Sequence, residues 1–96
     1  MNIIKSSIAG TMESSDIMIT IEPSSGGIEL ELKSQVEKQF GRQIRSVILK
    51  TLSELGVESA KVTAVDKGAM DCTIQARLKT AVHRSVSENC GSGREK

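Results

Sequence analysis

Few residues in this chain of 96 are of a type that could do chemistry. Two adjacent serines, Ser14 and Ser15, stand between Glu13 and Asp16 in the stretch "GTMESSDIMITI". Serine is a common turn residue, and its hydroxyl is also a handle to which a group can be attached. The pair is therefore either an ordinary set of turn residues or an attachment point, and the rest of the chain must decide between them.

The remaining candidates for catalysis are weak. His83 is the only histidine, and it follows Cys72 by eleven residues on one predicted helix. At a rise of 1.5 Å per residue the two lie on the order of 16 Å apart, too far for a nucleophile and its base. The chain has no Cys and His spacing typical of zinc and no glycine-rich phosphate loop of the known kinds. We expect His83 to be a surface histidine.

Two charge patterns remain. Glu29 and Glu31 share the outer face of a predicted strand, whereas a carboxylate pair for acid–base work needs one desolvated member. Lys38, Arg42 and Arg45 share a helix face opposite the apolar stripe, either as a solvated face or as a docking patch for an acidic or phosphate-bearing partner. The chain thus carries, binds or regulates something more plausibly than it catalyses.

Composition excludes several classes of protein. One domain with a thin core fits 96 residues, and 1% aromatic residues leave no stacking surface for single-stranded nucleic acid. A net charge of +1 creates no field for nucleic acid or anionic lipid. No apolar run reaches the ~20 residues of a membrane span, and the first ten residues lack the pattern of a signal peptide. Cys72 and Cys90 do not suggest a disulfide framework. We expect a cytoplasmic protein that binds neither nucleic acid nor membrane.

The elements that position the serines follow from hydrophobic periodicity. Two short apolar runs, residues 8–12 and 17–21, joined by "ESSD", predict a β-hairpin with Ser14 and Ser15 at its exposed tip. Residues 28–33 alternate between apolar and charged side chains, which predicts a third, half-buried strand.

Two helices and one more strand follow. Ser34 and Glu37 form a capping box, and Gly56 lies where a C′ glycine would end the first helix. Six residues form the apolar stripe of that helix: Val36, Phe40, Ile44, Val47, Ile48 and Leu55. The stretch "AKVTAV" predicts a fourth strand, and the helical period from Met70 to Val86 predicts a second helix.

The expected fold is therefore a small two-layer α+β domain: antiparallel strands (the hairpin plus the third strand), a long helix, a strand and a C-terminal helix. We expect residues 1–86 to form the domain and the polar, glycine-containing residues 87–96 to be a disordered tail.

Three stretches carry a resemblance to a known family. "AGTMESSDIMITIEP", "VEKQFGRQIR" and "VDKGAMDCTIQARL" follow one another between Ile8 and about Arg84, and together they resemble the acyl carrier protein, or gamma, subunit of citrate lyase. The carrier subunit of malonate decarboxylase, which uses the same kind of prosthetic group, is an alternative, and "VDKGAMDC" favours the citrate enzyme. A conventional acyl carrier displays D-S-L at the start of a helix in an acidic four-helix bundle. It ranks low because in this chain the serine precedes the acid, the context is strand-like and the net charge is +1. A noncatalytic interaction module with no modified serine is the remaining alternative.

The resemblance implies a specific chemistry. In the family a serine of the A-G-T-x-E-S-x-D segment carries 2′-(5″-phosphoribosyl)-3′-dephospho-coenzyme A through a phosphodiester bond. The serine directly after Glu13 is Ser14. The thiol of the group bears acetyl and citryl thioesters while the alpha subunit transfers the acyl group and the beta subunit cleaves citryl to oxaloacetate. The resemblance thus implies a noncatalytic carrier whose partners are these two subunits and the prosthetic-group transferase.

One position departs from the family pattern. The family form has Gly after the modified serine, "ESGD", where this chain has Ser15. Glycine there would relax a turn that needs a positive φ. Ser14 is favoured as the attachment site because Glu13 directly precedes it, and Ser15 is the second choice. Glu13 and Asp16 are expected to be solvated turn charges, with recognition by the transferase as a hypothesis for both, and no metal site is expected.

Overall fold

The computed structural model describes residues 3–34 and 37–86, with residues 37–39 described by their backbone alone. Four strands and two helices follow in the predicted order: β1 (Ser7–Gly10), β2 (Ile17–Glu22), β3 (Ile28–Ser34), α1 (Glu37–Glu54), β4 (Ala60–Asp66) and α2 (Asp71–Val86). The predicted tail at 87–96, residue Val36 and the side chain of Glu37, which is one half of the predicted capping box, lie outside what the structure describes.

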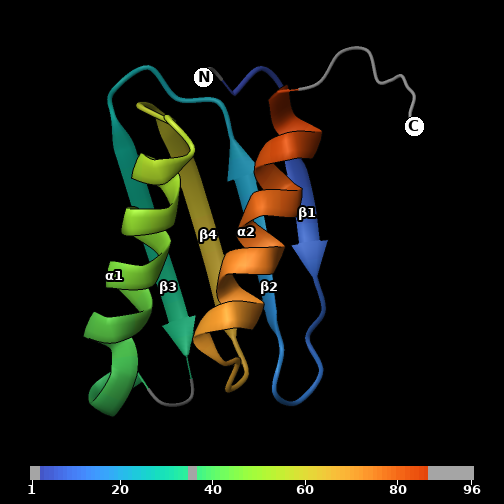
Figure 1. Ribbon diagram of the computed structural model, residues 1–96, viewed down its shortest axis with the longest axis vertical. Coiled ribbons are helices and arrows are strands. Elements are labelled where there is room, and N and C mark those ends of the chain that lie inside the picture. Colours follow the sequence, from blue (N-terminus) through green and yellow to red (C-terminus); the bar gives the residue numbers. More distant parts are fainter. Residues whose placement is uncertain (1–2, 35–36, 87–96) are drawn as a thin grey trace.

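The strands form one four-stranded sheet in the order β1-β2-β4-β3 (Figure 1). β1 and β2 make the predicted antiparallel hairpin, with Ala9 opposite Ile19, and β2 is also antiparallel to β4. The small α+β class is confirmed, but β3 departs from the expected antiparallel arrangement because it pairs parallel to β4. Helix α1 carries the chain back to the starting end of β3 before β4 begins, and such a crossover produces a parallel pair. The sheet is therefore mixed.

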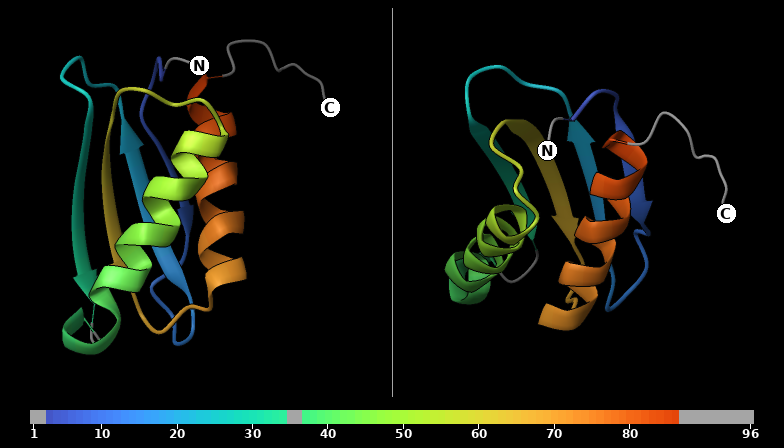
Figure 2. Two further views of the ribbon diagram at one scale, coloured as in Figure 1. Left: turned by 60° about the vertical axis from the view of Figure 1, so that its left-hand side comes forward. Right: turned by 45° about the horizontal axis from the view of Figure 1, so that its top comes forward.

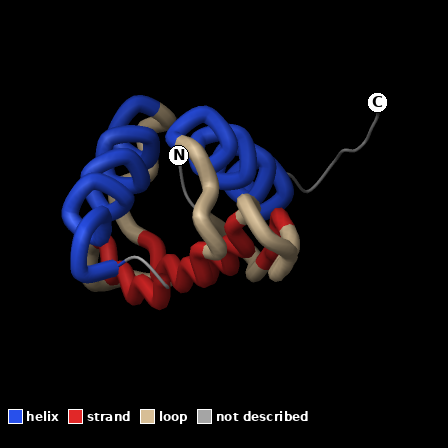
Figure 3. Tube along the Cα trace, turned by 90° about the horizontal axis from the view of Figure 1, so that it is seen from below, coloured by secondary structure: helices blue, strands red, loops and turns tan. Residues whose placement is uncertain are grey.

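Both helices lie on the same face of the sheet, which makes two layers (Figures 2 and 3). Alternate residues of the two central strands point into this layer and are buried: Ile17, Ile19 and Ile21 in β2, and Ala60, Val62 and Ala64 in β4. The helices close the core with Ile44, Ile48 and Leu52 from α1 and with Ile74, Leu78, Ala81 and Val82 from α2. The apolar residues of the alternating pattern that predicted the strands thus point into this core, and the residues between them lie on the open face of the sheet.

Some side chains differ from the expected pattern. The predicted apolar stripe of α1 includes Phe40, but this residue is 48% exposed and lines a groove against the loop before α2. Leu52, which the predicted stripe omitted, is buried in its place. Strand β1 ends at Gly10, so Met12 belongs to the following loop. Helix α1 ends as predicted, because Gly56 has a φ of +77° and the Val57 N–H donates to the Leu52 carbonyl at 3.0 Å.

Several loops and element ends meet at one end of the molecule, the lower end in Figure 1. The β1–β2 loop, the C-terminal ends of β3 and β4, and the beginning of α2 all lie there (Figure 1). This end holds both candidate serines, so it is where the site is built.

Candidate functional site

The two serines occupy the centre of a β-turn formed by residues 13–16, which we call the serine turn. The Asp16 N–H donates to the Glu13 carbonyl at 3.2 Å, which closes the turn. Ser15 has a φ of +64°, and among the described residues it is the only non-glycine with a positive φ. A positive φ at the third position alone is the pattern of a type II turn, in which glycine normally occupies that position. Ser14 therefore stands at the second position, the outer corner of the turn.

The serine turn is held against the loop that follows β4. The Ser15 N–H donates to the Lys67 carbonyl at 2.8 Å, and the Lys67 N–H donates to the Asp16 carbonyl at 2.9 Å. Two residues just before β2, Ser15 and Asp16, thus face one residue just after β4, which is the arrangement of a β-bulge with a left-handed first residue. A bulge redirects the side chains that follow it, and here Asp16 and Ile17 are both buried although they are adjacent in the sequence.

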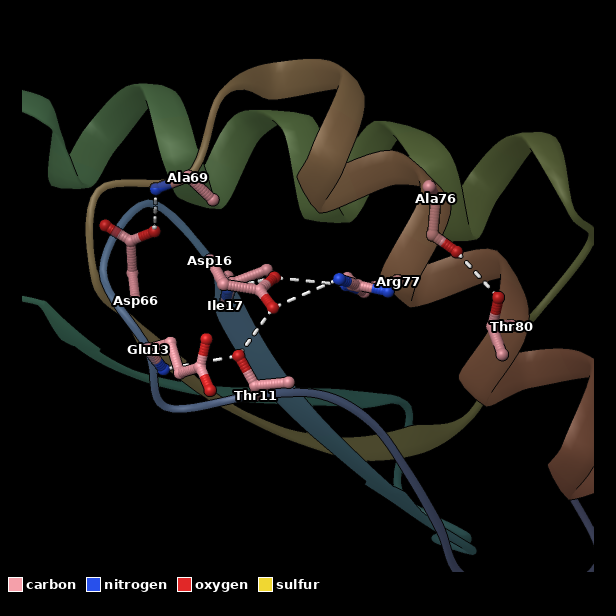
Figure 4. A network of polar contacts seen from close by, with 9 residues as sticks. All are labelled: Thr11, Glu13, Asp16, Ile17, Asp66, Ala69, Ala76, Arg77 and Thr80. Carbon is pink, nitrogen blue, oxygen red and sulfur yellow. Dashed lines mark hydrogen bonds and ion pairs between the residues drawn. The ribbon is translucent and has the colours of Figure 1, made fainter.

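Asp16 is the centre of a polar network with Thr11 and Arg77 (Figure 4). Arg77 of α2 donates from Nε to Oδ1 and from Nη2 to Oδ2, both at 3.0 Å. The Thr11 hydroxyl donates to Oδ2 at 2.6 Å, and the Ile17 N–H donates to Oδ1 at 2.7 Å. Both carboxylate oxygens are therefore fully used, and a two-pronged guanidinium contact fixes their direction.

This environment strongly favours the ionised form of Asp16. The hydrogen bonds from Arg77 are the largest cause that holds the pKa of the Asp16 carboxyl well below its usual range, followed by those from Thr11 and from the Ile17 N–H. The same contact raises the pKa of Arg77. The expectation that Asp16 is a solvated turn charge is wrong, because its residue surface is only 8% exposed and the carboxylate is enclosed by donors that replace water.

The base of the loop also depends on Gly10. Its φ is +98°, and a Cβ atom at this position would collide with the carbonyl of Ile17 across the hairpin. The Thr11 hydroxyl, which donates to Asp16, also accepts the Glu13 N–H at 3.2 Å. Gly10, Thr11 and Asp16 are thus the residues through which the hairpin shapes its tip.

A second buried carboxylate fixes the loop on the other side of the bulge. Asp66 accepts the Ser34 hydroxyl at 2.9 Å, the Gly68 N–H at 3.2 Å and the Ala69 N–H at 3.0 Å. These bonds shape the chain between β4 and α2, so Lys67 has a fixed backbone from which to pair with the serine turn.

In contrast, Ser14 and Glu13 offer free side chains. Both residues are exposed, and within the described part of the chain no hydrogen bond reaches the Ser14 hydroxyl or the Glu13 carboxylate. Ser15 is exposed as well, although its N–H is bound to Lys67. The arrangement presents the Ser14 hydroxyl at the corner of a turn whose backbone is anchored on both sides.

The other predicted candidates do not join this site. Cys72 and His83 are both exposed on α2, and Glu29 and Glu31 are exposed on the open face of β3. The described residues bring together no group of three His, Cys, Asp or Glu side chains that could hold a metal ion.

The basic stripe on α1 is described only in part. Arg42 is exposed and Arg45 is half-buried, and both line a shallow hollow on α1, whereas the side chain of Lys38 lies outside the described residues.

Within the described part of the chain neither helix is long and apolar enough to cross a bilayer.

An apolar groove opens beside the serine turn. It encloses about 480 Å³ between α1 and the loop before α2, and its lining includes Phe40, Ile44, Ala69 and Met70. Its lining includes Asp66 and Gly68, the residues on either side of the bulge partner Lys67. Two of the exposed large apolar side chains of the molecule, Phe40 at 48% and Met70 at 69%, thus flank the end that carries Ser14.

Sequence reasoning missed Arg77 and the role of Asp16. Arg77 lies within "VDKGAMDCTIQARL", and it interrupts a helix face between Ile74 and Leu78, both of which are buried. An arginine at the margin of an apolar stripe indicates a buried acidic partner. Its position in the sequence does not identify which acidic residue that partner is.

The chain is similar to known proteins over most of its length. The family model for the malonate decarboxylase delta subunit (MdcD) matches residues 4–85. The citrate lyase acyl carrier protein of Streptococcus uberis is 60% identical over 86 residues, which cover 90% of this chain and 85% of that protein. The protein of the same name from Halothermothrix orenii is 52% identical over 85 residues, 88% of this chain and 90% of its own length.

A solved structure shares the fold. A chain of a Pseudomonas malonate decarboxylase hetero-tetramer in complex with malonate superposes with a TM-score of 0.72, covering 88% of this chain and 91% of that one. Its sequence identity is 13%, so it supports the two-layer architecture alone. The identities of more than half over most of both chains decide the family. The resemblance inferred from the three motifs is confirmed, and this chain belongs to the citrate lyase acyl carrier protein family.

Proposed function

We propose that this protein is the noncatalytic acyl carrier subunit of a citrate lyase and that the Ser14 hydroxyl is the attachment point of its prosthetic group. The observation that carries the proposal is the contrast within the serine turn. Asp16 and the Ser15 N–H are engaged in hydrogen bonds, while the Ser14 side chain at the corner is exposed. A carrier needs such a fixed, accessible hydroxyl and no catalytic groups of its own.

The residues present fit a group attached through a phosphodiester. Formation of that bond requires a second enzyme to reach the serine Oγ, and the exposed corner of a turn gives that access. When bound, 2′-(5″-phosphoribosyl)-3′-dephospho-coenzyme A would supply a thiol for the acetyl and citryl thioesters. The protein's own residues hold the base of the arm still through the bulge and through Asp16. A tether of this kind raises the effective concentration of the acyl group at partner active sites, typically to millimolar values.

The turn geometry supports Ser14 over Ser15. Ser15 occupies the left-handed position, which is where the family pattern has glycine, and its side chain is therefore replaceable by a hydrogen atom. The second position of the turn, held by Ser14, makes no such demand. A hydroxyl that the family pattern dispenses with is a poor attachment point, so we assign the modification to Ser14.

The proposed partners are the alpha and beta subunits and the prosthetic-group transferase. Exposed apolar side chains at the Ser14 end, Met12 at 50%, Phe40 at 48% and Met70 at 69%, support docking there. Flexible methionines adapt to more than one surface, which suits a carrier that visits several enzymes. Glu13, exposed beside Ser14, is the proposed recognition charge for the transferase, and alanine at this position should slow the modification.

The experiment is an intact mass of the protein purified from cells that ferment citrate. A carrier of this family carries one adduct larger than 4′-phosphopantetheine by a phosphoribosyl-nucleotide portion. A chain of unmodified mass from such cells would overturn the carrier function and leave the noncatalytic interaction module as the reading.

A further inference from the structure

Arg77 links the serine turn to the second helix. It contacts Asp16 across 61 positions of sequence, and the Arg77 and Asp16 side chains are 42% and 12% exposed. The remaining donors to that carboxylate, Thr11 and the Ile17 N–H, come from the hairpin itself. Arg77 is therefore the residue of this network that ties the turn to the rest of the fold.

Turns of this type have a close conformational alternative. A type II turn becomes a type I turn when its central peptide rotates, which moves the third residue from a positive to a negative φ. For Ser15 that change relieves the steric penalty of a left-handed non-glycine residue. The rotation also turns the Ser15 N–H away from the Lys67 carbonyl, to which it donates at 2.8 Å. The rotation moves the Ser14 carbonyl and the Ser15 N–H to opposite sides of the turn, so the backbone beside the two hydroxyls differs between the two turn types.

We propose that Arg77 is a positioning residue that, through Asp16, makes Ser14 rather than Ser15 the hydroxyl that is modified. The forked contact fixes the carboxylate of the residue that directly follows Ser15. With Asp16 held in this direction, its carbonyl stays on the Lys67 N–H and the bulge keeps Ser15 left-handed. This inference rests on the proposed carrier function, and it adds to that function the reason why one of two neighbouring hydroxyls is chosen.

The helix provides a matched control. Arg84 lies two turns further along α2 and donates from Nη1 to the Ile8 carbonyl at 2.8 Å, away from the serine turn. Arg84→Gln removes the same charge from the same helix and a hydrogen bond to the same hairpin. Arg77→Lys keeps the charge but loses the forked geometry.

The experiment compares the wild-type chain, R77Q, R77K and R84Q, each expressed with a tag in a citrate-fermenting bacterium. Fragmentation mass spectrometry measures how the adduct divides between the two serines, and amide hydrogen exchange measures the opening of the Ser15 and Lys67 N–H groups. We expect the wild-type chain and R84Q to carry the adduct on Ser14 alone. R77Q should divide it between both serines or lose at least tenfold in modification rate, with at least tenfold faster exchange at Ser15. Adding Ser15→Gly to R77Q should restore Ser14 modification, because glycine adopts the positive φ without strain.

Two results would contradict the inference in different ways. An unmodified wild-type chain would overturn the carrier function and this inference with it. A wild-type chain modified on Ser14 together with an R77Q chain modified on the same serine at the same rate would overturn the role of Arg77 alone. R77K, whose retained charge favours folding, decides the question by the same division of the adduct if R77Q does not fold.

Discussion

At the scale of single residues, the site depends on one backbone conformation and one buried carboxylate. Ser15 adopts a φ of +64°, which costs a non-glycine residue free energy, and Asp16 turns inward directly after it. Together, these two features leave the Ser14 hydroxyl free at the corner of the turn. Each can be tested by a single substitution that leaves Ser14 in place.

Ser15→Gly should stabilise the protein. Glycine removes the left-handed penalty at a cost in unfolded-state entropy, so we expect a net gain of about 0.5–1 kcal/mol, which raises Tm by roughly 2–8 °C for a domain of this size. Thermal unfolding followed by circular dichroism measures it, since the chain has no Trp or Tyr for fluorescence. Ser14→Gly, at a position that makes no demand for glycine, is the control and should not raise Tm. A lower Tm for S15G would show that Ser15 is not strained.

The Asp16 carboxylate should make the free energy of unfolding decrease at acidic pH. Because Arg77 and Thr11 hold the pKa of Asp16 below its unfolded value of about 3.9, its stabilisation is complete above that value and is lost as the pH falls below it. The difference in free energy of unfolding between the wild-type chain and D16N should therefore be constant from pH 7 to about 5 and shrink toward pH 2. Urea unfolding at several pH values measures the difference. A difference that does not change with pH would show that the ionised carboxylate is not what stabilises the turn.

At the scale of elements, most of the fold was predictable because it follows from local periodicity. The hairpin, β3, α1, β4 and α2 were each expected from alternation or from a helical repeat, and they are present with small shifts at their ends. Pairing partners are not local, so the parallel β3–β4 contact was not foreseen. The contact between Asp16 and Arg77 was missed for the same reason. The sequence around each of these residues does not indicate that the other is its partner.

The hairpin itself should depend on Gly10 more than on other glycines. Gly10→Ala adds a collision with the Ile17 carbonyl to the strain of a positive φ, and overpacking of this kind costs about 1–3 kcal/mol beyond the conformational term. Gly27→Ala has a similar φ of +92° but open space around it, so it should cost only about 1 kcal/mol. Equilibrium unfolding in urea compares the two variants. Equal losses of stability would mean that the close approach across the hairpin is not what requires Gly10.

At the scale of the whole molecule, three segments that are separate in the sequence meet at one end. One segment is the serine turn, and another is the part of α1 that contains Gln43. The third is the stretch after β4 and into α2 that contains Lys67, Asp71 and Arg77. Gln43 donates to the Asp71 carboxylate at 3.2 Å, which joins α1 to the start of α2 beside the apolar groove. The motifs that indicated the family are thus the parts of one surface, and the remainder of the thin domain, 39 × 28 × 19 Å in extent, supports it.

The most direct test of the central claim is the fragmentation spectrum of the tryptic peptide 6–33, taken from the protein of citrate-fermenting cells. This peptide holds both serines of the turn and contains no internal Lys or Arg. We predict that fragments ending at Ser14 carry the adduct, that fragments ending at Glu13 do not, and that Ser14→Ala yields an unmodified peptide while Ser15→Gly yields a fully modified one. An adduct that first appears at Ser15, or a Ser14→Ala peptide that remains modified, would contradict the assignment of Ser14.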